Sequence, residues 1–320
     1  MRQETKRTLK RLFRNPSAVL GFALLLFFIL IAIFAPLLAP PVNSFNPSIK
    51  LPNPYIMPVV SWRQEPIPPT TKKDVDPQKL GREPIRCIDY HPFGVIGGRD
   101  IFCGRDIFYG VVWGTRTAFK VGIIVTVVST LIGITIGSIS GYFGGWIDEI
   151  LMRITDIFLS IPFLVAAIVL TTILGVGLDK VMIALIVFGW MGSARLIRGN
   201  ILQVKEEQFV LAARALGVRD IFIITKHILP NTIFPVVIQA SMRMGSLVIT
   251  AAALSFLGLG APQGYADWGA LLSYARDWML EIGKHWYAIV YPGTAMVLFV
   301  LAWNLVGDAL RDVFDPRLKS

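Results

Sequence analysis

Six long apolar stretches limit what this chain can fold into. A helix needs about 20 apolar residues to cross the hydrocarbon core of a bilayer, and each stretch reaches about that length. They cover approximately residues 18–38, 118–139, 154–174, 181–201, 232–257 and 286–306. Hydrophobic residues make up 54% of the 320 residues and charged residues only 16%, an apolar balance unusual for a soluble domain. The sequence therefore predicts an all-α membrane protein with six transmembrane helices.

Basic residues beside these stretches predict the topology. They are concentrated in the arm at 1–17, in the segment after the fourth stretch and in the tail at 311–320. Because Lys and Arg accumulate in cytoplasmic loops, we expect both termini to be cytoplasmic, in a multi-pass protein of a bacterial or archaeal plasma membrane. The net charge of +10 then requires no nucleic-acid partner, since the basic residues form no patch interleaved with aromatic side chains.

The predicted spans divide the chain into segments. We expect a cytoplasmic amphipathic arm at 1–17, a first transmembrane helix at 18–39, an extracytoplasmic loop at 40–114, a five-helix core at 115–310 and a cytoplasmic tail at 311–320. The arm either lies on membrane lipid or simply anchors the topology. The loop is rich in proline up to Pro69, so we expect extended chain with little core of its own. It contains Cys87 and Cys103, and we hypothesise a disulfide between them worth about 3 kcal/mol.

A charged, alanine-rich segment at residues 206–231, which we name the docking segment, interrupts the apolar pattern. Its first run of good helix formers ends at Gly217, and a second helical stretch runs from Asp220 to a closing Pro230. This pattern predicts helix, turn, helix at the membrane surface. Small residues would let another surface approach closely, and charged residues would keep the segment out of lipid. The small residues are Ala212, Ala213 and Ala215, and the charged ones are Glu206, Glu207, Arg214 and Arg219.

Motifs for catalysis are missing from the chain. It has no Gly-x-x-x-x-Gly-Lys-Ser/Thr phosphate loop, so any use of ATP requires a partner. It also has no Gly-x-Ser-x-Gly or His-Glu-x-x-His motif, and its three histidines are scattered between opposite faces of the membrane. We therefore expect no enzyme activity, no metal site and no cofactor on this chain.

Ionisable residues inside the predicted spans mark candidate functional positions. Asp156 lies near the start of the third span, and Arg243 lies about twelve residues into the fifth, near the bilayer midplane. Burial in lipid is costly for such groups, so both are candidates for a translocation pathway, where the arginine would meet a carboxylate. The alternative is a structural ion pair. Arg195 and Arg198 fall in the last turns of the fourth span, from which they would reach the headgroups.

The docking segment resembles the cytoplasmic loop of permease subunits in binding-protein-dependent ABC importers. The family pattern is Glu-Ala-Ala, three residues, Gly, nine residues, Ile-x-Leu-Pro. The matching residues are Ala212, Ala213, Gly217, Leu229 and Pro230, whereas Leu211 replaces the Glu and His227 replaces the Ile. The sequences at 91–94, 254–260 and 304–317 also resemble the second permease chain of the dipeptide, oligopeptide and nickel branch.

This resemblance implies a type I ABC importer permease fold, with residues 203–230 as the coupling segment. The residues implied to dock on the ATPase are Glu207, Ala212, Ala213, Arg214, Ala215, Gly217 and Pro230. The implied partners are a homologous permease chain, two cytoplasmic ATPase subunits that carry ATP and Mg²⁺, and an extracytoplasmic peptide-binding protein. The implied activity is ATP-driven uptake of di- or oligopeptides, and nickel or another solute is the alternative.

Two other classes of protein also fit an apolar chain with a docking segment. An ATP-independent carrier usually has charged pairs in several spans or broken helices, and we expect neither here. A membrane scaffold would explain the docking segment but not an arginine at the midplane. Both are less favoured than the importer permease.

Overall fold

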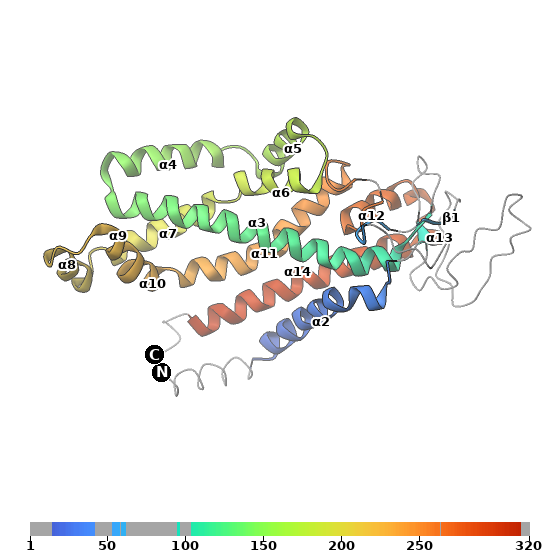
Figure 1. Cartoon of the computed structure of the whole chain (residues 1–320), viewed down its shortest axis with the longest axis horizontal. Coiled ribbons are helices and arrows are strands. Elements are labelled where there is room, and N and C mark those ends of the chain that lie inside the picture. Colours follow the sequence, from blue (N-terminus) through green and yellow to red (C-terminus); the bar gives the residue numbers. More distant parts are fainter. Residues whose placement is uncertain are drawn as a thin grey trace, which may run out of the picture.

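The computed structural model of the protein describes residues 15–41, 53–57, 59–61, 95–96, 104–262 and 264–314. Long helices run side by side through most of this part, with a small sheet and short helices at one end (Figure 1). The helical elements are α2 (Pro16–Leu38), α3 (Ile107–Phe143), α4 (Gly145–Leu159), α5 (Phe163–Leu174), α6 (Leu178–Val187), α7 (Met191–Val204), α8 (Gln208–Ala215), α9 (Asp220–Phe222), the π-helical turn η2 (Ile223–Ile228), α10 (Leu229–Thr232), α11 (Phe234–Phe256), α12 (Trp268–Arg276), the 3-10 turn η3 (Met279–Glu281), α13 (Ile282–His285) and α14 (Tyr287–Phe314). The strands β1 (Val59–Ser61), β2 (Val95–Ile96) and β3 (Gly104–Asp106) pair antiparallel in the order β1-β3-β2.

Five helical units in the described part are long and apolar enough to cross a membrane. They are α2, α3, α6 together with α7, α11 and α14. Helices α4 and α5 qualify together as a sixth, but they are bent by 85° at the break between them. The predicted all-α membrane fold is confirmed, whereas a single straight helix over 154–174 is wrong. Pro162 lies in the break, where it lacks an N–H and disfavours the helical conformation of the residue before it.

Helix α3 begins at Ile107, so the predicted loop at 40–114 extends too far. The carboxylate of Asp106 caps the helix by accepting from Phe108 N at 2.8 Å and Tyr109 N at 3.3 Å. Glycine, threonine and arginine at positions 110–116 lower the local hydropathy, and this obscured the first turns of the helix in the sequence. Gly114 is needed there for packing, because a Cβ at this position would lie 2.7 Å from Trp268 Cδ1.

Part of the long loop is anchored on the helices, and it stays a prediction that the loop has little core of its own. Met57 is fully buried, and its N–H donates to Gly264 O at 2.7 Å. Tyr55 O accepts from Ala266 N at 2.6 Å, and Tyr109 Oη donates to Pro54 O at 2.6 Å. These bonds fasten residues 53–57 to the start of α3 and to the segment before α12. The predicted disulfide cysteines, Cys87 and Cys103, lie outside the described residues.

Glycines allow α3 and α7 to approach closely. Gly133, Gly137 and Gly141 are spaced one helical turn apart on α3 and face the backbone of α7. A Cβ at Gly137 would lie 2.3 Å from Ala194 O, and one at Gly133 would lie 2.6 Å from Trp190 O. At these small residues the two helices touch through their backbones and not through interdigitated side chains, as is typical of helices packed in membranes. This pair forms the centre of the bundle that supports the docking segment.

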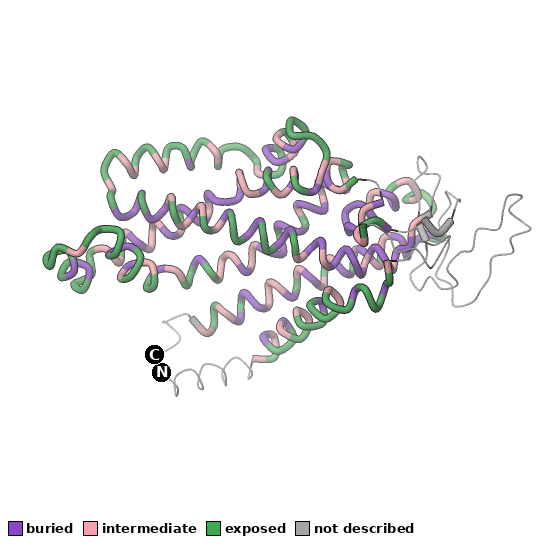
Figure 2. The backbone as a smooth tube through the Cα atoms, viewed as in Figure 1, coloured by how far each residue is buried: buried purple, intermediate pink, exposed green. Residues whose placement is uncertain are grey.

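Exposed residues follow the outer faces of the bundle (Figure 2). Many of them are large and apolar, as expected where lipid is the solvent. Leu26 and Ile33 of α2 and Val297 of α14 are examples. The start of α2 and the end of α14 lie together, since Asn15 Nδ2 donates to Asp312 Oδ2 at 3.0 Å. Both lie toward the end of the bundle that carries α8, α9 and α10 (Figure 1). This arrangement agrees with the predicted topology, although the side of the membrane stays a prediction.

Candidate functional site

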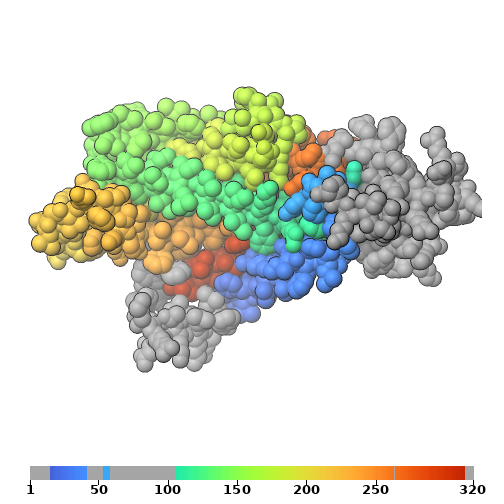
Figure 3. Space-filling model, in the orientation of Figure 1, coloured from blue at the N-terminus to red at the C-terminus, as the bar shows by residue number. Residues whose placement is uncertain are grey.

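The docking segment forms two helices joined by a turn, as predicted, and projects at one end of the molecule (Figure 3). The first helix, α8, begins after Glu207, whose carbonyl accepts from Val210 N at 3.0 Å. Gly217 adopts a φ of 72°, and its N–H donates to Arg214 O at 3.0 Å. This left-handed conformation strains residues with a side chain, which explains the glycine at the turn.

Large apolar side chains are exposed on the docking segment, although it lies beyond the apolar spans. We name the following residues the docking surface: Phe209, Leu211, Ala212, Ala215, Leu216, Ile221 and Phe222. Leu216 is 83% exposed and Ile221 is 60% exposed. Ala212 and Ala215 between them are exposed, and it stays a prediction that they admit a partner. The five large members were not predicted, because the apolar residues of a short amphipathic segment do not stand out in a chain that is 54% hydrophobic.

Two predicted docking residues have different roles. Ala213 is buried against Val210, Ile223 and Ile228, so it holds the two helices of the segment together and cannot receive a partner. Pro230 does not close the second helix, which continues through α10 to Thr232. Pro230 stands in the first turn of α10, where a missing N–H is tolerated. The π-helical turn η2 precedes it and shifts the hydrogen-bonding frame.

The docking segment is clamped to the end of α3. Tyr142 Oη donates to Asp220 Oδ1 at 2.5 Å, and the Arg214 guanidinium lies 5.4 Å from the centre of the Tyr142 ring. Lys205 Nζ donates to Gly141 O at 3.2 Å. Arg214, predicted to act in docking, therefore already has a partner within the chain. A displacement of the segment would be transmitted through these contacts to α3.

Two arginines of α7 pair with aspartates of α4, and it stays a prediction that they reach the headgroups. Arg198 binds Asp148 in a bidentate manner, with Nε to Oδ1 at 2.6 Å and Nη2 to Oδ2 at 2.5 Å. Arg195 Nη2 contacts Asp156 Oδ1 at 2.5 Å. The pathway candidate Asp156 thus forms an ion pair between helices. Charged pairs and a broken helix, both unexpected, are therefore present here.

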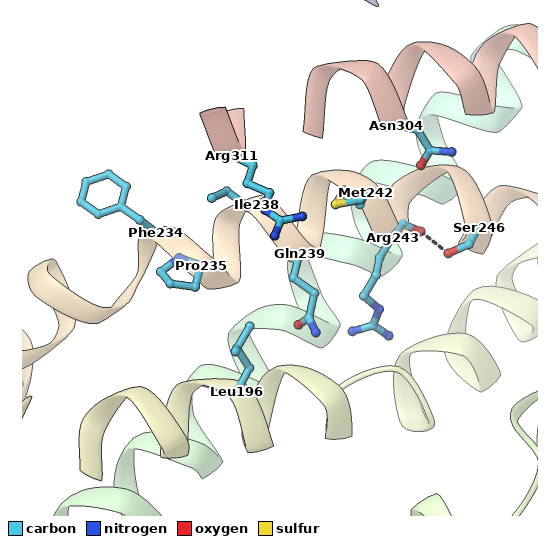
Figure 4. A pocket seen from close by; sticks show the side chains of 10 residues that line it. All are labelled: Leu196, Phe234, Pro235, Ile238, Gln239, Met242, Arg243, Ser246, Asn304 and Arg311. Atoms are coloured by element: carbon cyan, nitrogen blue, oxygen red, sulfur yellow. Dashed lines mark hydrogen bonds between the residues drawn. The ribbon is translucent and has the colours of Figure 1, made fainter. Parts of the chain in front are cut away.

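A cavity of about 640 Å³ opens among α7, α11 and α14 (Figure 4). Its lining residues are Leu196, Phe234, Pro235, Ile238, Gln239, Met242, Arg243, Ser246, Asn304 and Arg311. Arg243 belongs to this cavity and Asp156 does not, so the structure does not bring the two pathway candidates together. Arg311, predicted in the tail at 311–320, lies instead on α14, which extends to Phe314.

Arg243 is held by neutral groups. Its Nη2 donates to Gly189 O at 2.6 Å, and its Nη1 donates to Ser193 Oγ at 3.3 Å. Gly189 lies in the break between α6 and α7, where backbone carbonyls lose their helical donors. Within the described residues no carboxylate lies at ion-pair distance from this guanidinium, which argues against a structural ion pair inside this part of the chain.

A bundle of membrane-spanning helices with a cavity among them and a docking segment at one end defines the transmembrane subunit of a transporter. Residues 133–320 match the family model described as "Binding-protein-dependent transport system inner membrane component". Residues 4–53 match the "N-terminal TM domain of oligopeptide transport permease C". The chain belongs to the binding-protein-dependent transport system inner membrane component family.

Curated relatives support the same family. The chain is 36% identical over 314 residues to the dipeptide transport system permease protein DppC of Alkalihalophilus pseudofirmus, covering 97% of this chain and 89% of the relative. It is 44% identical over 217 residues to the glutathione transport system permease protein GsiD of Pectobacterium atrosepticum, covering 68% of this chain and 71% of that protein. The DppC of Bacillus subtilis is 31% identical over 310 residues, covering 97% of this chain and 85% of the relative.

A solved structure confirms the fold. A chain from a structure of the MetNI methionine ABC transporter matches with a TM-score of 0.51 at 20% identity, covering 64% of this chain and 96% of that chain. The fold is that of an ABC transporter permease. The chain is therefore a multi-pass membrane permease subunit of an ABC importer, a kind of subunit that works with ATPase and binding-protein partners.

Proposed function

We propose that the chain is the permease subunit of an ATP-driven importer of di- or oligopeptides and forms half of its translocation pathway. Its relatives transport dipeptides and glutathione by name, and glutathione is itself a peptide. These names favour peptides over the nickel alternative. The other half of the pathway is a homologous permease chain, and an extracytoplasmic binding protein delivers the peptide.

The docking surface carries this proposal. Exposed apolar side chains on a segment outside the lipid need a protein partner to cover them. Two cytoplasmic ATPase subunits are that partner in the proposed complex, and they hold ATP and Mg²⁺. Their closure moves the docking segment, and the contacts of Tyr142 and Lys205 transmit this motion to α3. Alternating access follows as rigid-body rocking of the two permease halves.

Reconstitution in proteoliposomes tests the proposal. We expect uptake of a radiolabelled di- or tripeptide only when this chain is combined with the second permease, the ATPase subunits, the binding protein and ATP. Uptake by this chain alone, driven by an ion gradient, would show a carrier instead. If the complete complex takes up no peptide under either condition, the peptide proposal is wrong.

A further inference from the structure

The cavity among α7, α11 and α14 combines positive charge with an apolar wall. Arg243 and Arg311 contribute two guanidinium groups, from the middle of α11 and the end of α14 (Figure 4). In the described part of the chain, neither group has a carboxylate within ion-pair distance. Phe234, Ile238 and Met242 supply apolar surface beside them. The cavity therefore attracts an anion that also carries an apolar part.

The position of Arg243 is set without neutralising its charge. Gly189 O and Ser193 Oγ each accept one of its hydrogen bonds, and both are uncharged groups. A guanidinium carries five N–H donors, so further donors stay available to a ligand. An uncompensated cation within a membrane span is costly unless a ligand or a wet cavity faces it. Arg243 is thus fixed in place, and within the described residues it has no counter-charge.

Neutral polar groups in the same cavity match an amide backbone. Gln239, Ser246 and Asn304 line it together with the arginines. The side-chain oxygen of Gln239 is buried, and within the described residues it has no hydrogen-bond donor. Rotation of the terminal amide would turn this oxygen toward a ligand N–H. The cavity thus offers donors for a carboxylate, an acceptor for an amide N–H and an apolar wall for a side chain.

We infer that this cavity binds the carboxyl-terminal end of the transported peptide, with Arg243 on the carboxylate, Arg311 adding positive charge to the same cavity and Gln239 on the adjacent N–H. This inference rests on the proposed function. The volume of about 640 Å³ suits a ligand of this size, since small-molecule cavities span about 300–1,000 Å³. A phospholipid phosphate would satisfy the arginines and the apolar wall, but it brings no amide N–H for Gln239.

Protection of a cysteine in the cavity tests this inference. The complete importer is reconstituted in nanodiscs with Cys87 and Cys103 replaced by serine and with Ser246→Cys in this chain. Alkylation of the new cysteine by N-ethylmaleimide is followed by mass spectrometry, with dialanine and trialanine or with their carboxyl-terminal amides. The free acids are expected to half-protect the cysteine at a concentration about tenfold lower than the amides, because one charge-assisted hydrogen bond supplies about this factor in affinity.

Charge variants provide the controls. Arg243→Gln should remove the protection, whereas Arg153→Gln should keep it, because Arg153 is exposed on α4, pairs with Glu149 and does not line the cavity. The comparison of acid with amide needs no arginine variant, so it stands even if Arg243→Gln fails to assemble.

Several results would overturn the inference. One is a complex that imports peptides in the uptake assay but shows equal protection by acids and amides, or none. Protection that depends only on exchanging phosphatidylcholine for phosphatidylglycerol in the nanodisc would show a lipid site instead. Failure of peptide uptake together with acid-specific protection would reject the proposed function and leave the cavity as a carboxylate site.

Discussion

Single side chains decide how the docking segment is attached to the bundle. Tyr142 contacts it twice, through its hydroxyl to Asp220 and through its ring to Arg214. Such contacts join residues about 70–80 positions apart in the chain. Neither could be predicted from spacing, because no periodic pattern links these positions. The identity of Tyr142 therefore matters for coupling rather than for membrane insertion.

Removing the Tyr142 hydroxyl should loosen the docking segment. Tyr142→Phe loses the bond to Asp220 and keeps the ring beneath Arg214, so we expect a local loss of about 1 kcal/mol. Hydrogen exchange of residues 206–231 should increase several-fold in the assembled permease. Asp220→Asn keeps an acceptor and should change exchange less. Equal exchange in Tyr142→Phe and the unaltered chain would show that the hydroxyl contributes nothing.

The burial of Asp267 leads us to expect that the free energy of unfolding depends on pH. This carboxylate is buried at the start of α12 and caps it by accepting from Ala270 N at 3.1 Å. Burial raises the pKa of Asp267 above its ordinary value, so the folded protein binds its proton more tightly than the unfolded chain does. The protonation of Asp267 therefore contributes fully to the free energy of unfolding at acid pH. This contribution decreases as pH rises from the ordinary carboxylate range through the raised pKa.

Asp267→Asn separates the cap from the charge. Asparagine is an equally good cap and carries no proton to lose. At neutral pH the variant should unfold at a temperature at least as high as the unaltered chain does. The fall in unfolding temperature between acid and neutral pH should also be smaller in the variant. Thermal unfolding in detergent at several pH values measures both. An unchanged pH profile would assign the dependence to other groups.

Helix packing depends on where small residues face. The glycines of α3 oppose the backbone of α7, whereas Gly199 of α7 has open space where a Cβ would stand. The sequence shows both kinds of glycine inside apolar stretches and does not distinguish them. Likewise, Pro162 lies at the bend between α4 and α5, and Asp106 caps α3 at Ile107, ahead of the apolar stretch. Hydropathy predicted the spans and missed these boundaries.

Gly137→Ala should separate α3 from α7. Its Cβ would lie 2.3 Å from Ala194 O and 2.2 Å from Ile197 Cγ2, so the helices must shift. We expect a loss of about 1–3 kcal/mol, as in overpacked cores. Gly199→Ala is the matched control and should be neutral or stabilising, since alanine favours helices by about 1 kcal/mol. Thermal unfolding of the purified permease compares them, and equal destabilisation of both would contradict the packing argument.

The docking segment lies at one end of the molecule, and η3 with α13 lies at the opposite end (Figure 1). Leu216 on the docking surface is 83% exposed, and Leu280 in η3 is 96% exposed. Helix α13, which follows η3, lies at the end of the bundle far from α8 (Figure 1). Two highly exposed leucines thus lie at opposite ends of the molecule, where different partners are proposed. They offer a direct comparison of the two ends.

Leu216→Glu should prevent binding of the ATPase subunits. A carboxylate at the centre of an apolar contact stays unpaired, so we expect co-purification of the ATPase subunits to fall at least about tenfold, with insertion and thermal stability unchanged. Leu280→Glu introduces the same charge at the other end and should leave ATPase binding intact. If both variants retain the ATPase subunits, the docking surface lies elsewhere.

The sequence by itself determined the membrane class, the number of apolar spans, the docking segment with its turn at Gly217, and the family. Each depends on composition or on the spacing of residues that are close in the sequence, and both can be read without the fold. Only the tertiary structure decided that Ala213 faces inward, that Arg195 and Arg198 pair with Asp156 and Asp148, and that Arg243 shares a cavity with Arg311. These facts depend on which helix faces which. That choice follows from close packing between distant segments, and no local pattern in the chain encodes it.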